Sequence, residues 1–264
     1  MAAKKNTPKE EVAEVLEVSQ GKIDCYVIGT SPLVLNRMSE KAKRELLMPK
    51  GRKTAVEKAT QLKHIPIDEY RASAYRLSDP KADTLLAVMA TSFKGALRNA
   101  ALDLPGAKKS QVGRLTYIDG DYIGIYGVPQ LYMAIVRSAD MNKTPDVRTR
   151  AIVPEWAARF TVTYVKPLIT AQAVANLLAA AGLTMGIGDG RPEKGAMSYG
   201  QFRLVGPNDE TFKRIVKEGG RVAQEASMES PDFYDDETAE LMAWFDEERA
   251  RRAKQGSAIK EVTA

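Results

Sequence analysis

The chain has 264 residues, enough for one large domain or two small ones, and its 44% hydrophobic and 28% charged content is typical of a folded globular protein. No window approaches the roughly 18 apolar residues that a membrane helix needs, and the start Met-Ala-Ala-Lys-Lys-Asn lacks the apolar stretch of a secretory signal. We therefore expect a cytoplasmic protein with no membrane partner. Its single cysteine, Cys25, excludes a disulfide within the chain and is expected to be a buried free thiol.

Charge is unevenly distributed along the chain. The net charge is +5, but residues 228–264 hold ten acidic and five basic side chains, so the residues before them carry +10. A basic body suggests a polyanionic partner, with the acidic tail available to mask the basic surface or to contact a neighbouring subunit. A charged surface that meets only solvent is the simpler explanation from charge alone.

The first third of the chain predicts an arm followed by short elements. Residues 1–20 are charged, contain Pro8 and predict an N-terminal arm, and a strand is expected at 22–28. Ser39 is a suitable N-cap for a short helix to Leu47, after which residues 49–53 form a basic loop. Further strands are predicted at 70–77 and 85–90.

An amphipathic helix is the clearest element of the sequence. Thr91 or Ser92 is expected to cap it, while Lys94 and Arg98 share a polar face. Its apolar residues recur at helical spacing: Phe93, Ala96, Leu97, Ala100 and Ala101.

The remainder alternates between strands and helices. Residues 105–155 look β-rich, with turns at 119–120 and 127–129 and a polar loop at 138–150. Residues 156–165 alternate as a half-buried strand, and Thr170 then caps a helix that Gly182 is expected to close. A glycine-rich loop (185–195) leads to a last strand at 198–205, and surface helices are expected at 208–217 and 236–254.

This order predicts an α+β fold with an RRM-like (ferredoxin-like) βαββαβ core over residues 21–206. The core elements are expected at 22–28, 91–102, 130–137, 156–165, 170–181 and 199–205. Large insertions then fall at about 30–84 and 103–155, and residues 207–264 form a helical, acidic C-terminal extension.

The glycine-rich loop is the strongest functional signal. Its glycines supply positive-φ positions and uncovered backbone amides, and Arg191 and Lys194 supply charge that attracts phosphate. The loop is neither a Walker loop nor a dinucleotide fingerprint, since no Lys-Ser or Lys-Thr follows it and it precedes a strand. A plain αβ connection that needs glycine for its turn explains it equally well. The glycines are Gly186, Gly188, Gly190 and Gly195.

Two motifs carry a family resemblance. The glycine-rich loop resembles that of the RAMP superfamily, and residues 92–98 (Ser-Phe-Lys-Gly-Ala-Leu-Arg) resemble its Ser-x-Lys-Gly-x-x-Arg motif. The chain is most similar to the guide-RNA-coating backbone subunits of CRISPR effector complexes and to related phage-encoded proteins. The resemblance covers about residues 84–102 and 156–205. It implies a cytoplasmic protein of a bacterium or a phage-infected host, whose copies stack along a single strand, and places Lys94, Arg98, Arg191 and Lys194 toward that strand.

Other basic residues are candidate contacts to the strand, each with an ordinary solvated side chain as the alternative. They are Arg37 and Lys41, the cluster Lys50, Arg52 and Lys53, the pair Lys108 and Lys109, and the pair Arg148 and Arg150. Because the aromatic platform of a single-domain RRM is only partly matched at 199–202, we expect backbone contacts and little base readout.

The case for an enzyme is weaker. His64 is the only histidine, which argues against a Ser-His-Asp triad or a histidine-rich metal site and indicates a loop residue. Asp119, Asp121 and Asp189 are weak candidates for a metal-assisted site. We expect no cofactor and no resident metal.

The leading hypothesis is a non-catalytic protein that multimerises on single-stranded RNA or DNA, alone or with other effector-complex subunits. One alternative is a metal-dependent ribonuclease of the same superfamily. The other is a protein-interaction or inhibitor module that mimics a backbone subunit.

Overall fold

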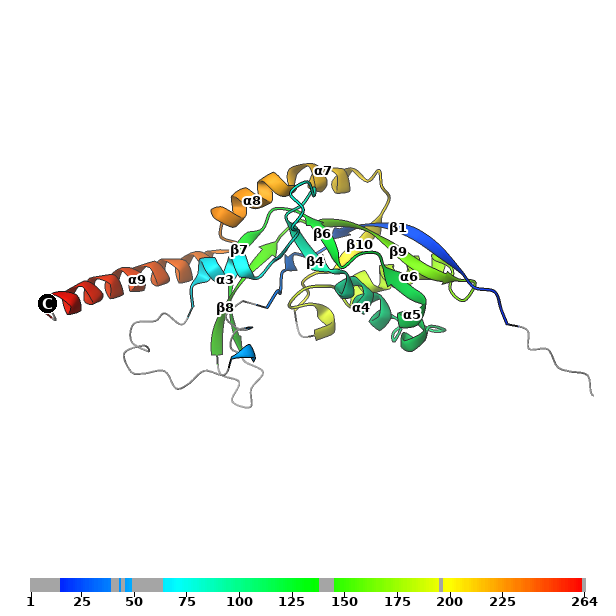
Figure 1. Ribbon diagram of the computed structural model, residues 1–264, viewed down its shortest axis with the longest axis horizontal. Helices are drawn as coiled ribbons and strands as arrows, with labels where there is room; N and C mark the ends of the chain where they lie inside the picture. The colour runs from blue at the N-terminus through cyan, green and yellow to red at the C-terminus, as the bar shows by residue number, and fades with distance from the viewer. Residues whose placement is uncertain are drawn as a thin grey trace, which may run out of the picture.

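The computed structural model describes residues 15–38, 43, 46–48, 64–137, 145–194 and 197–262. These residues form an α+β fold with two antiparallel sheets and helices on both faces of the larger one (Figure 1). Within the described ranges, no helix is both long enough and apolar enough to cross a lipid bilayer.

The larger sheet is strongly curled and has seven strands among the described residues. Its order is β10 (Phe202–Val205), β1 (Ser19–Gly29), β9 (Ala157–Lys166), β6 (Tyr122–Tyr126), β4 (Leu86–Met89) and β3 (Tyr75–Arg76), with β5 (Thr116–Ile118) also paired to β9. The smaller sheet has the order β2 (Leu33–Val34), β8 (Pro145–Val153) and β7 (Gln130–Arg137).

The helices pack around these sheets. They are α3 (Pro66–Ala72), α4 (Ala90–Ala100), α5 (Lys109–Leu115), α6 (Ala171–Thr184), the short 3-10 helix η1 (Pro192–Lys194), α7 (Glu210–Glu218), α8 (Arg221–Glu229) and α9 (Asp236–Val262). Helices α4 and α6 lie on one face of the larger sheet and α7 on the other (Figure 1).

The predicted ferredoxin-like core is present. β1, α4, β6, β9, α6 and β10 follow one another along the chain, and β1 pairs with β10 on one side and β9 on the other. Its apolar centre lies under α4 and α6, where the Phe93 ring lies 4.4 Å from the Phe160 ring and 5.4 Å from the Phe202 ring, measured between centroids. Cys25 faces this core, and burial raises the pKa of its thiol to about 12, so the prediction of a buried free thiol is confirmed.

One core strand differs from the prediction. Residues 130–137 form a strand, β7, but it pairs with β8 in the smaller sheet. β5 and β6 take the position beside β9 instead. With three and five residues they are too short for alternation to stand out in the sequence, whereas the eight residues of β7 give a stronger local pattern.

The secondary structure of two other segments also differs from the prediction. Residues 70–77 are not one strand: Pro66–Ala72 form α3, because Pro66 suits a helix start and acidic residues occupy the first turn, and only Tyr75–Arg76 extend. Residues 145–150, predicted as part of a polar loop, belong to β8 and pair with β7 along its length. The predicted cap Ser39 and the basic loop 49–53 lie outside the described residues.

The helix caps are only partly as predicted. The Thr170 hydroxyl accepts a hydrogen bond from the Ala173 amide and caps α6 as expected. Helix α4 instead begins at Ala90 after an extended Met89, so Thr91 and Ser92 lie within its first turn. Gly182 lies inside α6, where a side chain would collide with the backbone of Phe202, so it permits close packing of α6 on β10.

The residues after β10 pack against the rest of the fold through α7, α8 and the first turns of α9. The predicted helices at 208–217 and 236–254 correspond to α7 and α9, and α8 between them was not predicted. The side chain of Gln224 on α8 is fully buried. Its oxygen accepts from the amides of Leu85 and Leu86, and its nitrogen donates to the carbonyls of Ile125, Gly127 and Gly219.

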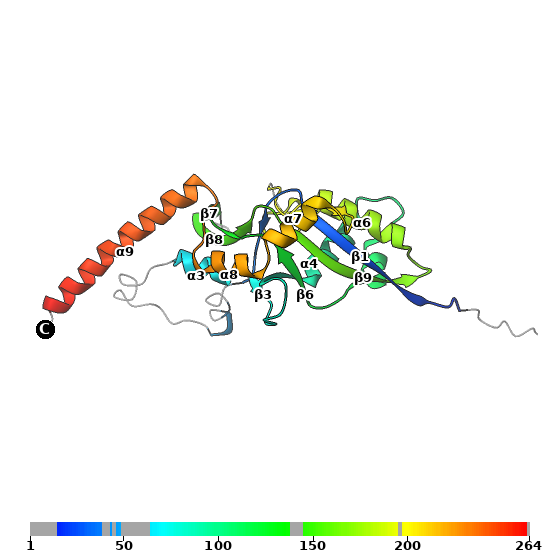
Figure 2. The same ribbon diagram turned by 90° about the horizontal axis from the view of Figure 1, so that it is seen from above.

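Helix α9 packs on β7 through its first turns and then leaves the body. It extends away from the end of the molecule opposite the start of β1, as two perpendicular views show (Figures 1 and 2).

Candidate functional site

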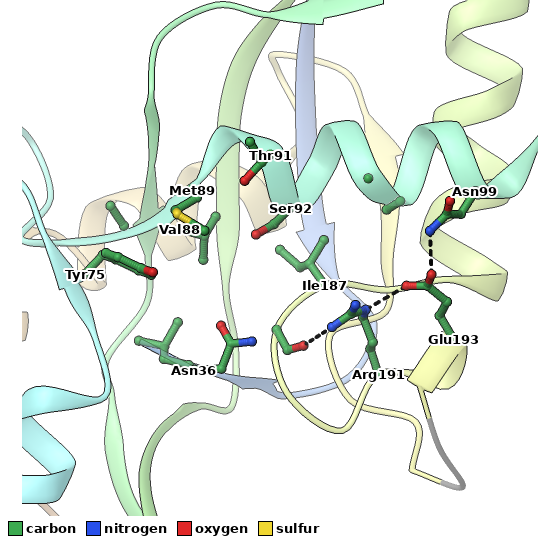
Figure 3. Close-up of a pocket in the computed structure, with 15 residues that line it drawn as sticks. Asn36, Tyr75, Val88, Met89, Thr91, Ser92, Asn99, Ile187, Arg191 and Glu193 are labelled. Atoms are coloured by element: carbon green, nitrogen blue, oxygen red, sulfur yellow. Dashed lines mark hydrogen bonds and ion pairs between the residues drawn. The ribbon is translucent and has the colours of Figure 1, made fainter. Parts of the chain in front are cut away.

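A cavity of about 290 Å³ lies where α4 begins, beside the glycine-rich loop (Figure 3). One face of α4 forms its wall through Thr91, Ser92, Gly95 and Asn99. The opposing walls come from the end of β4, the segment after β2, β3 and the loop: Ala87, Met89, Leu35, Asn36, Tyr75, Ile187, Gly188, Arg191 and Glu193. The two sequence motifs, about ninety residues apart, therefore contribute to one cavity.

The loop has its shape because of its glycines. Gly186, Gly188 and Gly190 have φ angles of 64°, 81° and 63°, which L side chains rarely adopt. A side chain on Gly188 would also contact the backbone oxygen of Val34, to which the Asp189 amide donates at 2.9 Å. The loop is thereby pressed onto β2, with Ile187 buried against the cavity. Gly195 lies outside the described residues.

The N-terminus of α4 presents polar groups to the cavity. No side chain caps this end, and its first turn contains no acidic residue that would offset the positive end of the helix dipole. The Thr91 and Ser92 side chains line the cavity from this turn (Figure 3). The combination of helix amides and hydroxyls suits an anionic oxygen.

Arg191 is fixed in the opposite wall. Its Nη1 donates to the carbonyl of Gly188 at 2.9 Å and its Nε donates to the Glu193 carboxylate at 2.9 Å. Glu193 also accepts from the Asn99 amide, which ties the loop to α4 (Figure 3). Glu193 therefore offsets much of the Arg191 charge, and Arg191 acts in this wall mainly as a directed hydrogen-bond donor.

Tyrosine and arginine side chains gather at the rim of the cavity. The Tyr75 ring lies 5.6 Å from the Tyr122 ring, and the Arg37 guanidinium is 6.0 Å from the Tyr75 centroid. Burial first, and then the like charges of Arg71 and Arg37, lower the pKa of Arg76. Among the described residues no carboxylate forms an ion pair with Arg71 or Arg76. Although Arg71 donates to the backbone carbonyls of Met228 and Glu229, positive charge is concentrated on this side of Tyr75.

The predicted cations are not all brought together. Lys94 lies on another flank of α4, with its Nζ 4.7 Å from the Tyr117 ring centroid, and the stem of Arg98 packs beside Gly113 of α5. Lys194 is exposed on η1, next to Arg191 in the chain. Lys41, Lys50, Arg52 and Lys53 lie outside the described residues.

Arg148 and Arg150 lie on β8, on the face of the smaller sheet that approaches the loop. Arg148 is exposed, whereas Arg150 is partly buried and its Nε lies 3.8 Å from the Asp189 carboxylate. Burial lowers the pKa of Arg150 despite this pairing.

A group of three tyrosines adjoins Arg150. Tyr132 stands opposite Arg150 in the β7–β8 ladder, and its ring lies 6.2 Å from that of Tyr199 and 5.4 Å from that of Tyr234. Burial, followed by a side-chain hydrogen bond with Tyr199, raises the pKa of Tyr132.

The candidate catalytic acids have separate partners. Asp119 accepts from Lys22 at 2.8 Å and Thr163 at 2.7 Å, and the Lys22 bond is the main reason that the pKa of Asp119 is lowered. Asp121 is exposed, and Asp189 pairs with Arg150. In the described parts of the chain, no three His, Cys, Asp or Glu side chains are grouped so as to hold a metal ion. His64 bridges Glu69 and Asp146 at 2.9 and 3.1 Å, so it joins α3 to β8.

Sequence reasoning missed several residues of the cavity and its rim: Asn36, Tyr75, Arg71, Arg76, Asn99 and Tyr122. They lie on five different segments of the sequence, and the pairing of β3, β4 and β6 brings Tyr75 and Tyr122 together.

Comparisons with known proteins add a structural likeness. No family model matches the sequence, and no curated protein matches it. Among solved structures, the chain is similar to Cmr6 from Pyrococcus furiosus, with a TM-score of 0.35 and 10% identity over 71% of this chain and 99% of that one. At this level the likeness assigns neither a family nor a function.

Proposed function

We propose that this protein binds single-stranded nucleic acid, with the cavity at the start of α4 receiving part of the strand. The observation that carries the proposal is the convergence of the two motifs on one cavity, together with the arginine-rich rim beside it. Hydrogen-bond donors of the kind that bind phosphate oxygens come from the Ser92 hydroxyl, the Arg191 guanidinium and the start of α4. This helix end has no side-chain cap, although its first amide, that of Ala90, donates to the Asp121 carbonyl.

The long-range attraction comes from the rim and not from the wall. Glu193 accompanies Arg191 inside the cavity, whereas Arg71 and Arg76 concentrate charge outside it. Contacts of this kind are largely independent of base sequence and weaken as salt rises, because counterions released from the phosphates lose their entropic advantage.

Multimerisation along the strand is part of the proposal. The resemblance of residues 92–98 and 186–195 to RAMP motifs favours copies that stack side by side, as in a guide-RNA coat or a phage single-strand-handling complex. The start of β1 and the free part of α9 lie at opposite ends of the molecule, which suits a repeated head-to-tail contact (Figure 2).

The first test is purification with nuclease omitted. The absorbance ratio at 260 and 280 nm is followed through size exclusion, and bound material is digested with RNase or DNase. We expect large complexes that protect a strand, and the nuclease sensitivity identifies the polymer. A clean monomer that also ignores added single-stranded RNA and DNA at low salt contradicts the proposal and favours a protein-interaction module.

Charge variants test the placement of the strand. Lys194→Ala removes an exposed cation beside the cavity wall and should lower affinity to a similar extent for all sequences, reducing the slope of log K against log salt by about one. Lys217→Ala on α7, across the larger sheet, is the matched control and should leave the slope unchanged. Equal slopes for both variants would remove Lys194 from the interface.

A further inference from the structure

We propose that the cavity also accepts one unstacked base, which stacks on Tyr75 and Tyr122 while its phosphate is held near the start of α4. This inference rests on the proposed function and extends it from backbone contacts to base contacts. It predicts a preference for strands whose bases are free to leave the stack, and therefore for single strands over duplexes.

The two rings are arranged for stacking. Tyr75 pairs with Ala87 across β3 and β4, and Tyr122 pairs with Met89 across β4 and β6, so the two tyrosines flank β4 on the same face of the sheet. Tyr75 lines the cavity and its ring points into it (Figure 3). Tyr122 is 48% exposed and Met89 is 39% exposed, which makes this edge an open apolar surface next to positive charge.

The polar lining matches the edge of a base. The side-chain amide of Asn36 lies in the cavity between Tyr75 and Arg191, and Asn99 lies on the α4 wall (Figure 3). An amide offers both a donor and an acceptor, as a base edge does. The Asn99 Oδ1 atom is buried and has no hydrogen-bond partner among the described residues, although its nitrogen donates to Glu193.

Size and charge favour a base attached to a strand over a free ligand. At about 290 Å³ the cavity is at the lower limit of ligand pockets, which span roughly 300–1,000 Å³, so it holds one base and leaves the chain outside. The guanidinium of Arg37 lies 6.0 Å from the Tyr75 centroid, so phosphates of a strand whose base stacks on Tyr75 would pass near a positive charge.

The test compares an intact single strand of about twelve nucleotides with an abasic strand of the same length and charge, by fluorescence anisotropy at low salt. We expect the intact strand to bind more tightly. Tyr122→Leu should weaken binding of the intact strand about tenfold and leave binding of the abasic strand unchanged. Tyr117→Leu is the matched control. Tyr117 is 47% exposed, close to the 48% of Tyr122, but it lies on β5, where its ring contacts Lys94 of α4 and not the cavity.

Two further measurements distinguish loss of the base contact from misfolding of a variant. Tyr75→Phe keeps the ring and should bind as the unchanged protein does, whereas Tyr75→Leu should lose affinity for the intact strand. In the unchanged protein, a 2-aminopurine base in the strand should change its fluorescence on binding, since stacking on tyrosine alters its surroundings.

The outcomes separate the two proposals. Equal binding of intact and abasic strands overturns the base subsite and leaves the proposed function standing. A preference for the intact strand that survives both Tyr75→Leu and Tyr122→Leu also overturns it, because the base is then held elsewhere. Failure of both strands to bind overturns the proposed function itself.

Discussion

Two groups of tyrosines lie near the glycine-rich loop, and they differ in how many rings pack together and in the angle at which the rings meet. On the cavity side, Tyr75 and Tyr122 form an open pair with Arg37 nearby. On the other side, Tyr132, Tyr199 and Tyr234 form a closed group whose rings meet edge to face. Burial raises the pKa of both Tyr132 and Tyr234.

The difference separates stabilising aromatics from binding aromatics. In the closed group all three rings are partly buried and Tyr132 contacts both of the others, so the group anchors the loop to β7 and to the start of α9. The open pair still has apolar surface exposed to water, and covering that surface is what drives a ligand onto it. The number of tyrosines near a loop is therefore a poor guide to binding, whereas their exposure is a good one.

The largest expected effect comes from breaking the loop that separates the two groups. Gly200 has a φ of 69°, and a side chain there would collide with the carbonyl oxygen of Ile187 on the cavity side. Gly200→Ala should lower the free energy of unfolding by about 3 kcal/mol or more, measured by urea denaturation. Gly206→Ala, where a side chain meets open space, is the control and should change stability by less than about 1 kcal/mol. Equal stability of the two variants would show that the loop is not held as described.

A smaller effect distinguishes the two groups directly. Tyr132→Leu removes the ring contacts and the hydrogen bond of the closed group and should lower the free energy of unfolding by about 2 kcal/mol. Tyr122→Leu removes an exposed ring and should change it by less than about 0.5 kcal/mol. Thermal unfolding of both variants provides the measurement. A greater loss for Tyr122→Leu would reverse the assignment of the two groups.

The smallest expected effect is on the stability of the protein at alkaline pH, where Tyr132 ionises in the unfolded chain. Because the folded state raises the pKa of Tyr132, its hydroxyl stays protonated when the unfolded chain ionises near pH 10. The unfolded state then binds fewer protons, so stability falls as pH rises above about 10. Tyr132→Phe lacks this group, and its free energy of unfolding should decline less steeply between about pH 10 and 11.5. Parallel declines in the two proteins would show that Tyr132 ionises freely in the fold.

The sequence predicted what depends on local pattern. The helical spacing from Phe93 to Ala101, the alternation of β9 and the cap at Thr170 are properties of short segments, and all three appear in the structure. The pairing of β7 with β8 is a long-range choice that no local pattern records, and the same holds for the position of β5 and β6 beside β9.

The candidate site divides in the same way. Ser92 and Gly188 belong to motifs that are visible in the sequence, whereas Tyr75 and Asn36 become cavity residues only through strand pairing and loop packing. Arg191 was singled out in the sequence as a cation that attracts phosphate, and its pairing with Glu193, two residues along the chain, changes that expectation from a free cation to a positioned donor. Local charge counts give no access to such pairings.

The buried side-chain amide of Gln224 has a consequence for how the chain folds during its synthesis. It completes the hydrogen bonds of the backbone at residues 85–86 and at 125–127, although it leaves the ribosome about a hundred residues after the second of these segments. Until then, the start of β4 and the end of β6, the strand that carries Tyr122, have unpaired backbone polar groups. The nascent chain must therefore keep this region hydrated until residue 224 has left the ribosome.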